Sequence, residues 1–426
     1  MILRKLTNIK TMKRIILLSI ATLSLYSASA QIAHDGWRGP NRTGIYAETG
    51  LLKQWPEAGP ALLWESLEAG KGYSSPVVAG DRVYITGMSD DQSMEIFTAY
   101  TLDGKKLYSV PYSKPWDGQY PETRTTPTID NGKAYLISGA GQIVCINTLD
   151  GKILWSVDGA KQFARKTGNW GTSECALVFD NKVIYTPGGD LTTMVALDKN
   201  TGKEIWRSGA LGDPSTYLSP LLIEYKGRRQ IVGATANNMI GVNPDTGKIE
   251  WQYAIKPKTE ASWANIAPNT PLYKDGKLFY SHGYDIFSFM LQIADDMQSV
   301  KLVWHNGDMD THHGGYVLID DTIYGTNHDR VSSAWCALDW QTGKTLYADA
   351  WANKSAGVVI SADGMLYCYS ERTGAVALVR PSREKFEVVS QFRITKGSGP
   401  HWAHPVIKDG VMYLRHGEAL MAYKIK

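Results

Sequence analysis

Aromatic, histidine and other polar side chains recur just before short apolar segments of the chain, and together they could bind a small ligand. The candidates are Arg124, Trp170, Glu174, Trp263, Asn265, His312, His313, His401, Trp402 and His404. Indole faces stack on flat or ring-shaped groups, whereas guanidinium, imidazole and amide groups supply hydrogen bonds. A pocket that combines the two is typical of sites for polar ring-shaped molecules such as sugars or quinones.

The same residues have structural alternatives, and the sequence identifies no catalytic residue. Polar residues before a strand often satisfy loop backbone groups, and an indole there can simply pack on its neighbour. Glu174 and a histidine would need to approach within ~3 Å for acid–base chemistry. Adjacent residues of a strand point to opposite faces, as do residues three apart. Without a bend in the loop, neither His312–His313 nor His401 with His404 can therefore bind one ion, so we predict no metal site and assign no role to histidines such as His328.

The elements that position these residues are copies of one repeated unit. A Gly-Lys-x-x-aromatic motif begins at Gly104, Gly151, Gly202, Gly247 and Gly343, and weaker copies at Lys301 and Lys385 keep only the lysine. The lysines follow one another at intervals of 41 to 53 residues. Each copy is preceded by an apolar stretch, a turn of the Asp-Gly or Asn-Gly kind, and two more apolar stretches, which is the pattern of a hairpin and a third strand. Each unit is therefore predicted to be a four-stranded antiparallel meander.

Four-stranded units of this period predict an all-β, eight-bladed β-propeller. Seven units are complete, and an eighth begins at His401 but has only three strands before Lys426. Residues 62–64, which end on Trp64, match the missing fourth strand, so an N-terminal strand should complete the last blade and leave no open sheet edge. We expect a signal peptide over 1–30, an N-terminal extension over 31–58 and the propeller over 59–426. A β-sandwich with long insertions fits the regular repeat poorly.

Propeller symmetry brings the candidate site residues to one end of the central channel. All of them precede the innermost strand of a blade, and rotation about the ring superimposes these stretches. The aromatic residues that end the repeats should instead be structural and buried between blades: Trp64, Trp155, Trp206, Trp251 and Trp304.

The first 30 residues have the features of an export signal. Lys13 and Arg14 precede the apolar run 15–25, and residues 28–30 read Ala-Ser-Ala, so we expect cleavage near Ala30 and a periplasmic or secreted protein. The formal charge is +3, and removing the five basic residues of this segment leaves −2. A body so close to neutral argues against a nucleic-acid partner. No segment is long and apolar enough to span a membrane. We expect the protein to be a monomer. The sequence leaves open whether Cys145, Cys175, Cys336 and Cys368 form disulfides; for the three within strands a buried free thiol is the expectation.

The Asp-x-x-Thr-Gly-Lys-x-x-Trp motif resembles the repeat of PQQ-dependent alcohol dehydrogenases, which an outer-membrane assembly lipoprotein shares. Over 37–426 the chain resembles the exported PQQ-binding-like β-propeller repeat proteins of this superfamily, in segments that begin at Trp37, Trp170, His312, Ala362 and His401. The resemblance implies the propeller fold and blade docking by the repeat tryptophans. The redox-active relatives bind PQQ with adjacent cysteines and a stacking Trp, and hold a calcium ion with Glu, Asn and Asp ligands. The resemblance therefore also implies such a site as an expectation for this chain. This chain has no two adjacent cysteines; its nearest counterparts are Glu174, Trp263 and Asn265.

Three functions remain open on the sequence. The first is an exported propeller that binds a small polar ligand, a carbohydrate or a quinone, at the channel mouth. The second is a PQQ-dependent alcohol or sugar dehydrogenase. The third is a protein-interaction scaffold of the cell envelope, which the absence of a lipid-anchor cysteine after Ala30 disfavours.

Overall fold

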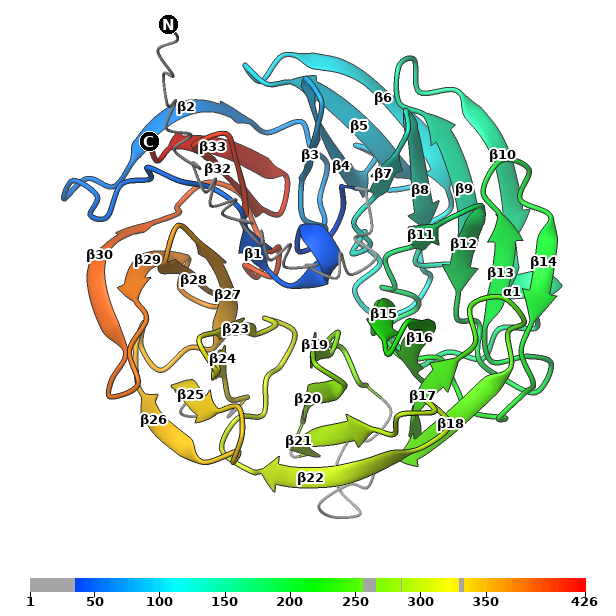
Figure 1. Cartoon of the computed structure of the whole chain (residues 1–426). Coiled ribbons are helices and arrows are strands. Elements are labelled where there is room, and N and C mark those ends of the chain that lie inside the picture. Colours follow the sequence, from blue (N-terminus) through cyan, green and yellow to red (C-terminus); the bar gives the residue numbers. More distant parts are fainter. Residues whose placement is uncertain (1–34, 256–265, 285, 329–332) are drawn as a thin grey trace, which may run out of the picture.

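The computed structural model shows a closed ring of eight β-sheets around a central channel (Figure 1). It describes residues 35–426 apart from 256–265, 285 and 329–332. Seven sheets have four strands and one has five, and strands consecutive in the sequence pair antiparallel within each blade. The predicted all-β, eight-bladed propeller is therefore confirmed. The first strand of a blade lies toward the central channel and the fourth lies at the outer edge, except that in blade 7 the N-terminal strand β1 (Ile45–Tyr46) lies inside the first strand (Figure 1).

The first four blades follow one another in chain order. Blade 1 consists of β3 (Val77–Ala79), β4 (Arg82–Met88), β5 (Glu95–Thr101) and β6 (Lys106–Ser113). Blade 2 consists of β7 (Thr128–Asp130), β8 (Lys133–Ile137), β9 (Gln142–Asn147) and β10 (Ile153–Asp158), after which comes the short helix α1 (Gly159–Gln162). Blade 3 consists of β11 (Leu177–Phe179), β12 (Lys182–Tyr185), β13 (Val195–Asp198) and β14 (Glu204–Arg207). Blade 4 consists of β15 (Leu221–Tyr225), β16 (Arg228–Ala234), β17 (Asn238–Val242) and β18 (Ile249–Ala254).

The last four blades complete the circle. Blade 5 consists of β19 (Leu272–Lys274), β20 (Lys277–Gly283), β21 (Ile286–Ile293) and β22 (Val300–Asn306). Blade 6 consists of β23 (Val317–Ile319), β24 (Thr322–Thr326), β25 (Trp335–Asp339) and β26 (Thr345–Asp349). Blade 7 consists of β27 (Gly357–Ala362), β28 (Met365–Ser370), β29 (Ala375–Arg380) and β30 (Glu387–Arg393). Blade 8 consists of β31 (Val406–Lys408), β32 (Val411–His416), β33 (Ala419–Lys424) and the N-terminal strand β2 (Ala61–Ser66).

The N-terminal strand closes the ring as predicted. Strand β2 pairs antiparallel with β33, so that Leu62 lies opposite Tyr423 and Trp64 opposite Ala422. Because the first and last parts of the chain share one sheet, blade 8 has four strands, and β33 is paired on both sides, with β32 and with β2.

The repeated turn explains the spacing of the sequence motif. In blade 3 the Asp198 carboxylate accepts hydrogen bonds from the backbone N–H groups of Asn200 and Thr201, at 3.1 and 3.0 Å. Gly202 closes the turn with a φ of +71°, a conformation that favours glycine. A Cβ at Gly202 would also lie 2.8 Å from the ring of Trp155, which belongs to the preceding blade. Glycine is thus required at this position of the motif for two reasons, the positive φ and the close approach of the indole.

Tryptophans at the ends of the repeats join each blade to the next. The indole N–H of Trp155, Trp206, Trp304 and Trp64 donates to the carbonyl at the second position of the following turn, namely Lys199, Pro244, Trp340 and Leu102. Trp155, Trp206 and Trp251 are buried, whereas Trp64 and Trp304 are partly buried. Trp251 differs because its N–H donates to Gln230 within its own blade, at 2.7 Å. The corresponding turn of blade 5 has no motif glycine. The contact between the two blades is made by Gln230, whose amide donates to the Met297 carbonyl in that turn.

The N-terminal segment 35–58 crosses the centre of the ring, where the 3₁₀ turn η1 (Pro40–Arg42) lies over the channel (Figure 1). Strand β1 (Ile45–Tyr46) pairs parallel with β27 and becomes the fifth strand of blade 7. The buried Arg38 donates to the carbonyls of Tyr316 and Val359, and the buried Arg42 donates to those of Cys175 and Ala176. The segment expected only as an extension therefore ties blade 3 to blades 6 and 7.

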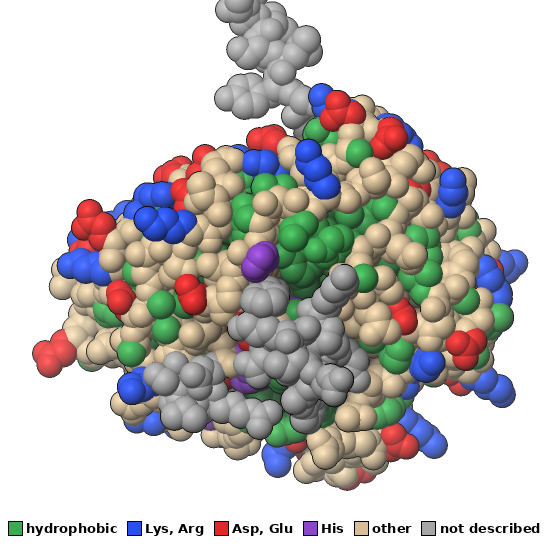
Figure 2. Space-filling model, turned by 90° about the horizontal axis from the view of Figure 1, so that it is seen from below, with side chains coloured by type: hydrophobic (Ala, Val, Ile, Leu, Met, Phe, Trp, Pro, Cys, Tyr) green, Lys and Arg blue, Asp and Glu red, His purple; other side chains and the backbone are tan. Residues whose placement is uncertain are grey.

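The outer strands leave some apolar side chains in contact with solvent. Leu302 and Val303 of β22 are 45% and 42% exposed. On the side of the molecule where β22 lies, hydrophobic side chains gather in one patch and most charged side chains lie toward the periphery (Figure 2). In the described part of the chain no helix has the length and hydrophobicity needed to cross a membrane. All four cysteines are buried free thiols, as expected for the three within strands.

Candidate functional site

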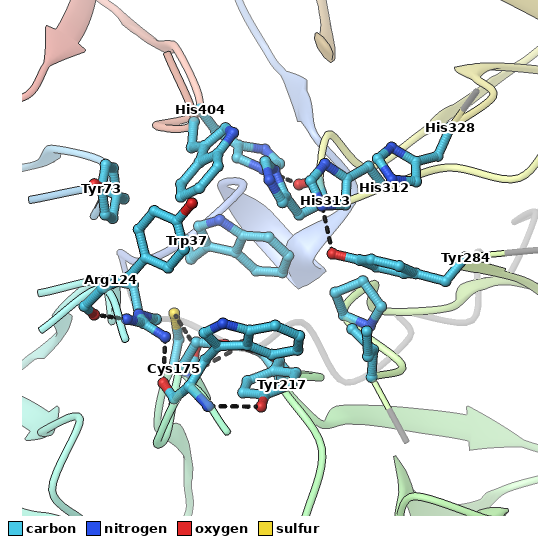
Figure 3. A pocket seen from close by; sticks show the side chains of 17 residues that line it. Trp37, Tyr73, Arg124, Cys175, Tyr217, Tyr284, His312, His313, His328 and His404 are labelled. Carbon is cyan, nitrogen blue, oxygen red and sulfur yellow. Dashed lines mark hydrogen bonds between the residues drawn. The ribbon is translucent and has the colours of Figure 1, made fainter. Parts of the chain in front are cut away.

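A cavity of about 360 Å³ lies at one end of the channel, between the N-terminal segment and the loops of the blades (Figure 3). Its walls are mainly aromatic: Trp37, Tyr73, Tyr120, Trp170, Tyr217, Tyr284 and Trp402. Its polar groups are mainly cationic or imidazole side chains: Arg124, His312, His313, His328 and His404. Small and apolar residues complete the lining: Ser173, Cys175, Ser219, Ile266 and Pro268. The volume falls within the ~300–1,000 Å³ of typical small-molecule sites.

The predicted mouth residues are brought together only in part. Six of them line the cavity: Arg124, Trp170, His312, His313, Trp402 and His404. Trp263 and Asn265 lie outside the described residues. Glu174 and His401 are directed to other parts of the protein. That the six side chains bind a ligand stays a prediction, but their convergence from blades far apart in the sequence follows from the ring symmetry.

Glu174 supports a strand instead of lining the cavity. Its carboxylate accepts from the backbone N–H of Thr186 at 2.9 Å and from the Thr186 hydroxyl at 3.1 Å. The side chain is buried, and this burial raises its pKa to about 8 even though Thr186 and the Arg42 guanidinium act in the opposite direction. Its contacts hold the end of β12 against the segment entering β11. The structure therefore favours the structural explanation for Glu174.

His401 also points away from the cavity. Its Nδ1 lies 2.6 Å from the Tyr369 hydroxyl, and its ring stacks on His416 with centroids 3.6 Å apart. Burial, followed by the nearby His416, lowers the pKa of His401 to about 3. His401 and His404 are thus separated by the loop before β31, and only His404 reaches the cavity.

His404 is bonded on both ring nitrogens, which defines its tautomer. Arg38 Nη1 lies 3.0 Å from Nδ1, and because a guanidinium only donates, Nδ1 must be the acceptor. The proton is therefore on Nε2, which donates to the His313 carbonyl at 2.9 Å. Burial and the Arg38 charge hold the pKa of His404 well below its usual value. His404 is a neutral imidazole that connects the N-terminal segment to the His313 loop.

Arg124 lies on the side of the cavity opposite Tyr284 and His328 (Figure 3). Its guanidinium donates to the carbonyls of Trp170 and Tyr120, so it fixes two aromatic residues of the wall. The Tyr217 hydroxyl accepts from the Trp170 backbone N–H at 3.2 Å and places its ring beside the indole. Burial lowers the pKa of Arg124. Arg124 therefore both shapes the aromatic wall and contributes positive charge to the cavity.

His312, His313 and His328 form a cluster on the cavity wall that faces Arg124 (Figure 3). The ring of His312 lies 3.7 Å from that of His313 and 4.1 Å from that of His328, measured between centroids. The loop bends at His313 and Gly314, so the expectation that adjacent residues point to opposite faces does not apply to this pair. His312 Nδ1 lies 3.2 Å from Glu371 Oε2, and its Nε2 lies 2.5 Å from the Tyr284 hydroxyl.

The lining also contains residues that were not among the predicted site residues, including Trp37, Tyr120, Tyr284 and His328. Tyr284 and His328 follow β20 and β24, the second strands of their blades. In an antiparallel meander the loop that leaves the second strand opens at the same end as the segment that enters the first. This rule could have found both residues. Trp37 belongs to the N-terminal segment, which has no counterpart in the repeat.

The described lining does not fit the calcium-assisted quinone site that the resemblance implies. Calcium requires several oxygen ligands, and no Asp or Glu occurs among the described residues that line the cavity. Glu174, the nearest sequence counterpart of a calcium ligand, is bonded to Thr186. Cys175, the cysteine of the lining, is a free thiol whose Sγ accepts from the Thr126 backbone N–H at 3.3 Å.

Comparisons with known proteins agree with this architecture. In the structure of BamB from Moraxella catarrhalis, 13% of residues are identical, the match covers 86% of this chain and 99% of that one, and the TM-score is 0.63. Quinohemoprotein alcohol dehydrogenase from Comamonas testosteroni is 12% identical over 90% of this chain and 79% of its own, with a TM-score of 0.65. A europium-containing methanol dehydrogenase is 14% identical over 88% of both chains, with a TM-score of 0.63. At these identities the likeness shows the fold alone.

Sequence comparison identifies the family. No curated protein matches the chain. The family model described as outer membrane protein assembly factor BamB, whose repeats are of the PQQ type, matches residues 93–353, more than half of the chain. The chain therefore belongs to this family of PQQ-like β-propellers.

Proposed function

We propose that the protein is an exported β-propeller that binds a small carbohydrate in the cavity at the channel mouth. The observation that carries this proposal is the composition of the cavity, where seven aromatic side chains surround a few polar groups in a volume of about 360 Å³. The C–H faces of a sugar ring pack on aromatic faces, while its hydroxyl groups need donors and acceptors at the edge. The described cavity offers both kinds of contact.

The charge of the polar groups supports a neutral ligand over a quinone with several carboxylates. Burial holds the pKa of His313 and that of His404 well below the usual value, so both imidazoles are neutral near pH 7. Both ring nitrogens of His404 are already bonded, to Arg38 and to the His313 carbonyl. His313, whose Nε2 has no hydrogen-bond partner among the described residues, is therefore the neutral imidazole that suits a hydroxyl group. Arg124 is the charged side chain among the described lining residues. One guanidinium leaves most of the charge of a polycarboxylate uncompensated, whereas a sugar needs no such compensation.

A titration separates the proposal from the dehydrogenase alternative. The purified protein is titrated with a panel of monosaccharides and disaccharides, and separately with PQQ in the presence of calcium, while tryptophan fluorescence is recorded. We expect at least one sugar to bind and PQQ not to bind stoichiometrically. Trp170→Ala and Trp402→Ala should each weaken sugar binding about 10-fold, the loss expected when a stacking face worth ~1.4 kcal/mol is removed.

The matched control is Trp351→Ala. Trp351 is a partly buried indole outside the cavity, where its N–H donates to Gln391. This variant should bind the sugar like the parent protein, and circular dichroism establishes that each variant retains the fold. Stoichiometric PQQ binding with dye-linked oxidation of an alcohol would favour the dehydrogenase and overturn the proposal.

A scaffold function is the second candidate, and the exposed outer strands favour it. Leu62 and Leu63 of β2 are 47% and 50% exposed, and β22 exposes a similar pair. Apolar side chains at a sheet edge are suited to contacts with another protein. If Leu62→Ser and Leu63→Ser leave the mass of complexes recovered by cross-linking from the cell envelope unchanged, the scaffold function is disfavoured.

A further inference from the structure

Two histidines and a glutamate from different blades converge at the cavity wall. His312 and His313 precede β23 in blade 6, whereas Glu371 follows β28 in blade 7. Each offers one potential ligand atom, and these atoms all lie within 4.8 Å of one another. His312 Nδ1 and Glu371 Oε2 lie 3.2 Å apart. Two ligand atoms on one tetrahedral zinc ion lie ~3.3 Å apart, because each bond is ~2.0–2.1 Å long.

The backbone around the cluster is held by packing. A Cβ at Gly314 would lie 1.9 Å from the Gly357 carbonyl oxygen, so the bend after His313 requires glycine at this close approach. His404 Nε2 donates to the His313 carbonyl and fixes the same bend from the other side. The backbone N–H of Glu371 donates to Ala356, and its carbonyl accepts from His401. The three side chains are therefore presented by a rigid frame, as a metal site requires.

Two further observations point to an ion. His313 Nε2 is buried and has no hydrogen-bond partner among the described residues, which leaves a ligand atom unsatisfied. His312 Nε2 lies 2.5 Å from the Tyr284 hydroxyl. With Nδ1 on a metal, the Nε2–H would donate to that hydroxyl, which is the outer-shell bond that metal-bound histidines usually make.

We propose that His312, His313 and Glu371 bind one divalent transition-metal ion of the zinc type at the wall of the cavity. Imidazole nitrogens suit zinc and its neighbours, and two histidines with one carboxylate are a known ligand set for ions that keep an open position. Both histidines line the cavity, so the open position faces it and can take water or a hydroxyl group of a bound molecule. The site does not depend on which molecule the cavity binds.

The test measures binding of the metal alone. The protein is freed of metal with a chelator and titrated with ZnCl₂ in a calorimeter, and a second sample is titrated with CoCl₂ while its visible absorption is recorded. We expect one ion per chain and the ligand-field bands of cobalt bound to nitrogen and oxygen. His312→Ala, His313→Ala and Glu371→Gln should each weaken zinc binding at least 10-fold, and Tyr284→Phe about 10-fold through loss of the outer-shell bond.

The control is His305→Ala, since His305 is an exposed histidine on the outer strand β22. This variant should bind zinc like the parent protein, and His313→Gln provides a second, more conservative change if an alanine variant does not fold. The absence of stoichiometric zinc and cobalt binding by the parent protein would overturn the proposal. Zinc binding that all the cluster variants retain would overturn it as well.

Discussion

The guanidinium of Arg38 donates to Nδ1 of His404 at 3.0 Å, at the buried centre of the ring. This bond joins the N-terminal segment to the loop before the innermost strand of blade 8. Through its Nε2–H, His404 in turn fixes the carbonyl of His313. The arrangement makes the N-terminal segment part of the cavity, which explains why Trp37, one residue before Arg38, lines the wall.

Removal of the Arg38 guanidinium should therefore destabilise the whole ring. Arg38→Met leaves the buried carbonyls of Tyr316 and Val359 without their donor. Each buried group that loses its partner costs about 1–3 kcal/mol, so we expect a loss of at least that size in the free energy of unfolding. Chemical denaturation measures the change. Arg207→Met is the control, because Arg207 pairs with Glu204 at the surface and should matter little. Equal effects of the two changes would contradict the role given to Arg38.

The docking tryptophans should carry much of the stability between blades. Trp206 is 7% exposed and donates to the Pro244 carbonyl of the next blade at 3.1 Å. Trp206→Ala should lower the free energy of unfolding by about 3–5 kcal/mol, the range for deletion of a large core aromatic. Leu154→Ala, at an exposed position of β10, should change it by less than about 0.5 kcal/mol. A melting temperature unchanged in the Trp206 variant would show that the indole does not join the blades.

Alanine variants of two glycines with the same backbone conformation allow the effect of the docking contact to be measured apart from that of backbone strain. Gly247 and Gly364 have φ values of +74° and +73°. A Cβ at Gly247 would lie 2.4 Å from the Trp206 ring, whereas a Cβ at Gly364 would meet nothing within 4 Å. Both alanine variants incur the left-handed penalty of about 1–2 kcal/mol, and only Gly247→Ala must also displace an indole. We expect Gly247→Ala to melt at a clearly lower temperature than Gly364→Ala. Equal melting temperatures would mean that the indole adapts at no cost.

Glu174 should make stability fall as the pH rises. Burial raises its pKa in the folded protein to about 8, from an ordinary value of 4.5. Between these values the folded state binds more protons than the unfolded state, so the contribution is complete below pH 4.5 and is lost as the pH rises through about 8. Burial also raises the pKa of Glu95, to about 7, so the interval between pH 7 and 8 reports mainly on Glu174.

Glu174→Gln tests this assignment. The amide keeps an oxygen that can accept from the Thr186 N–H but does not titrate. Unfolding curves recorded between pH 7 and 8 should show a smaller loss of stability in this variant than in the parent protein. Glu204→Gln, at an exposed position, should leave the slope unchanged. Parallel pH profiles for the parent and Glu174→Gln would show that the carboxyl is already ionised in the folded state.

The fold could be predicted from the sequence because its signals are local and repeated. The Asp198-type turn and its glycine recur in several blades, and the three-stranded last unit required a partner that only residues near Trp64 could supply. The Trp251 contact could not be foreseen in the same way, since it depends on which groups the next turn presents. Its bond to Gln230 replaces the carbonyl that other blades offer.

The cavity could be predicted only to the level of which loops meet. Symmetry brings the loops before the innermost strands together, but it does not decide where a side chain within a loop points. His401 and His404 illustrate this, because the first packs on His416 and the second reaches the cavity. His328 lies in a loop after a second strand, so a rule for the loops before the innermost strands does not reach it, although both kinds of loop open at the same end. Trp37 was missed because its segment lies outside the repeat.

A crystal structure of the protein grown with the sugar that binds most tightly in the panel tests the central claim most directly. The proposal predicts that the sugar occupies the cavity, with its ring stacked on Trp170 or Trp402 and its hydroxyl groups within hydrogen-bond distance of Arg124 or the histidines. A sugar bound at any other place, or a cavity filled only by water in crystals grown well above the dissociation constant, would contradict it.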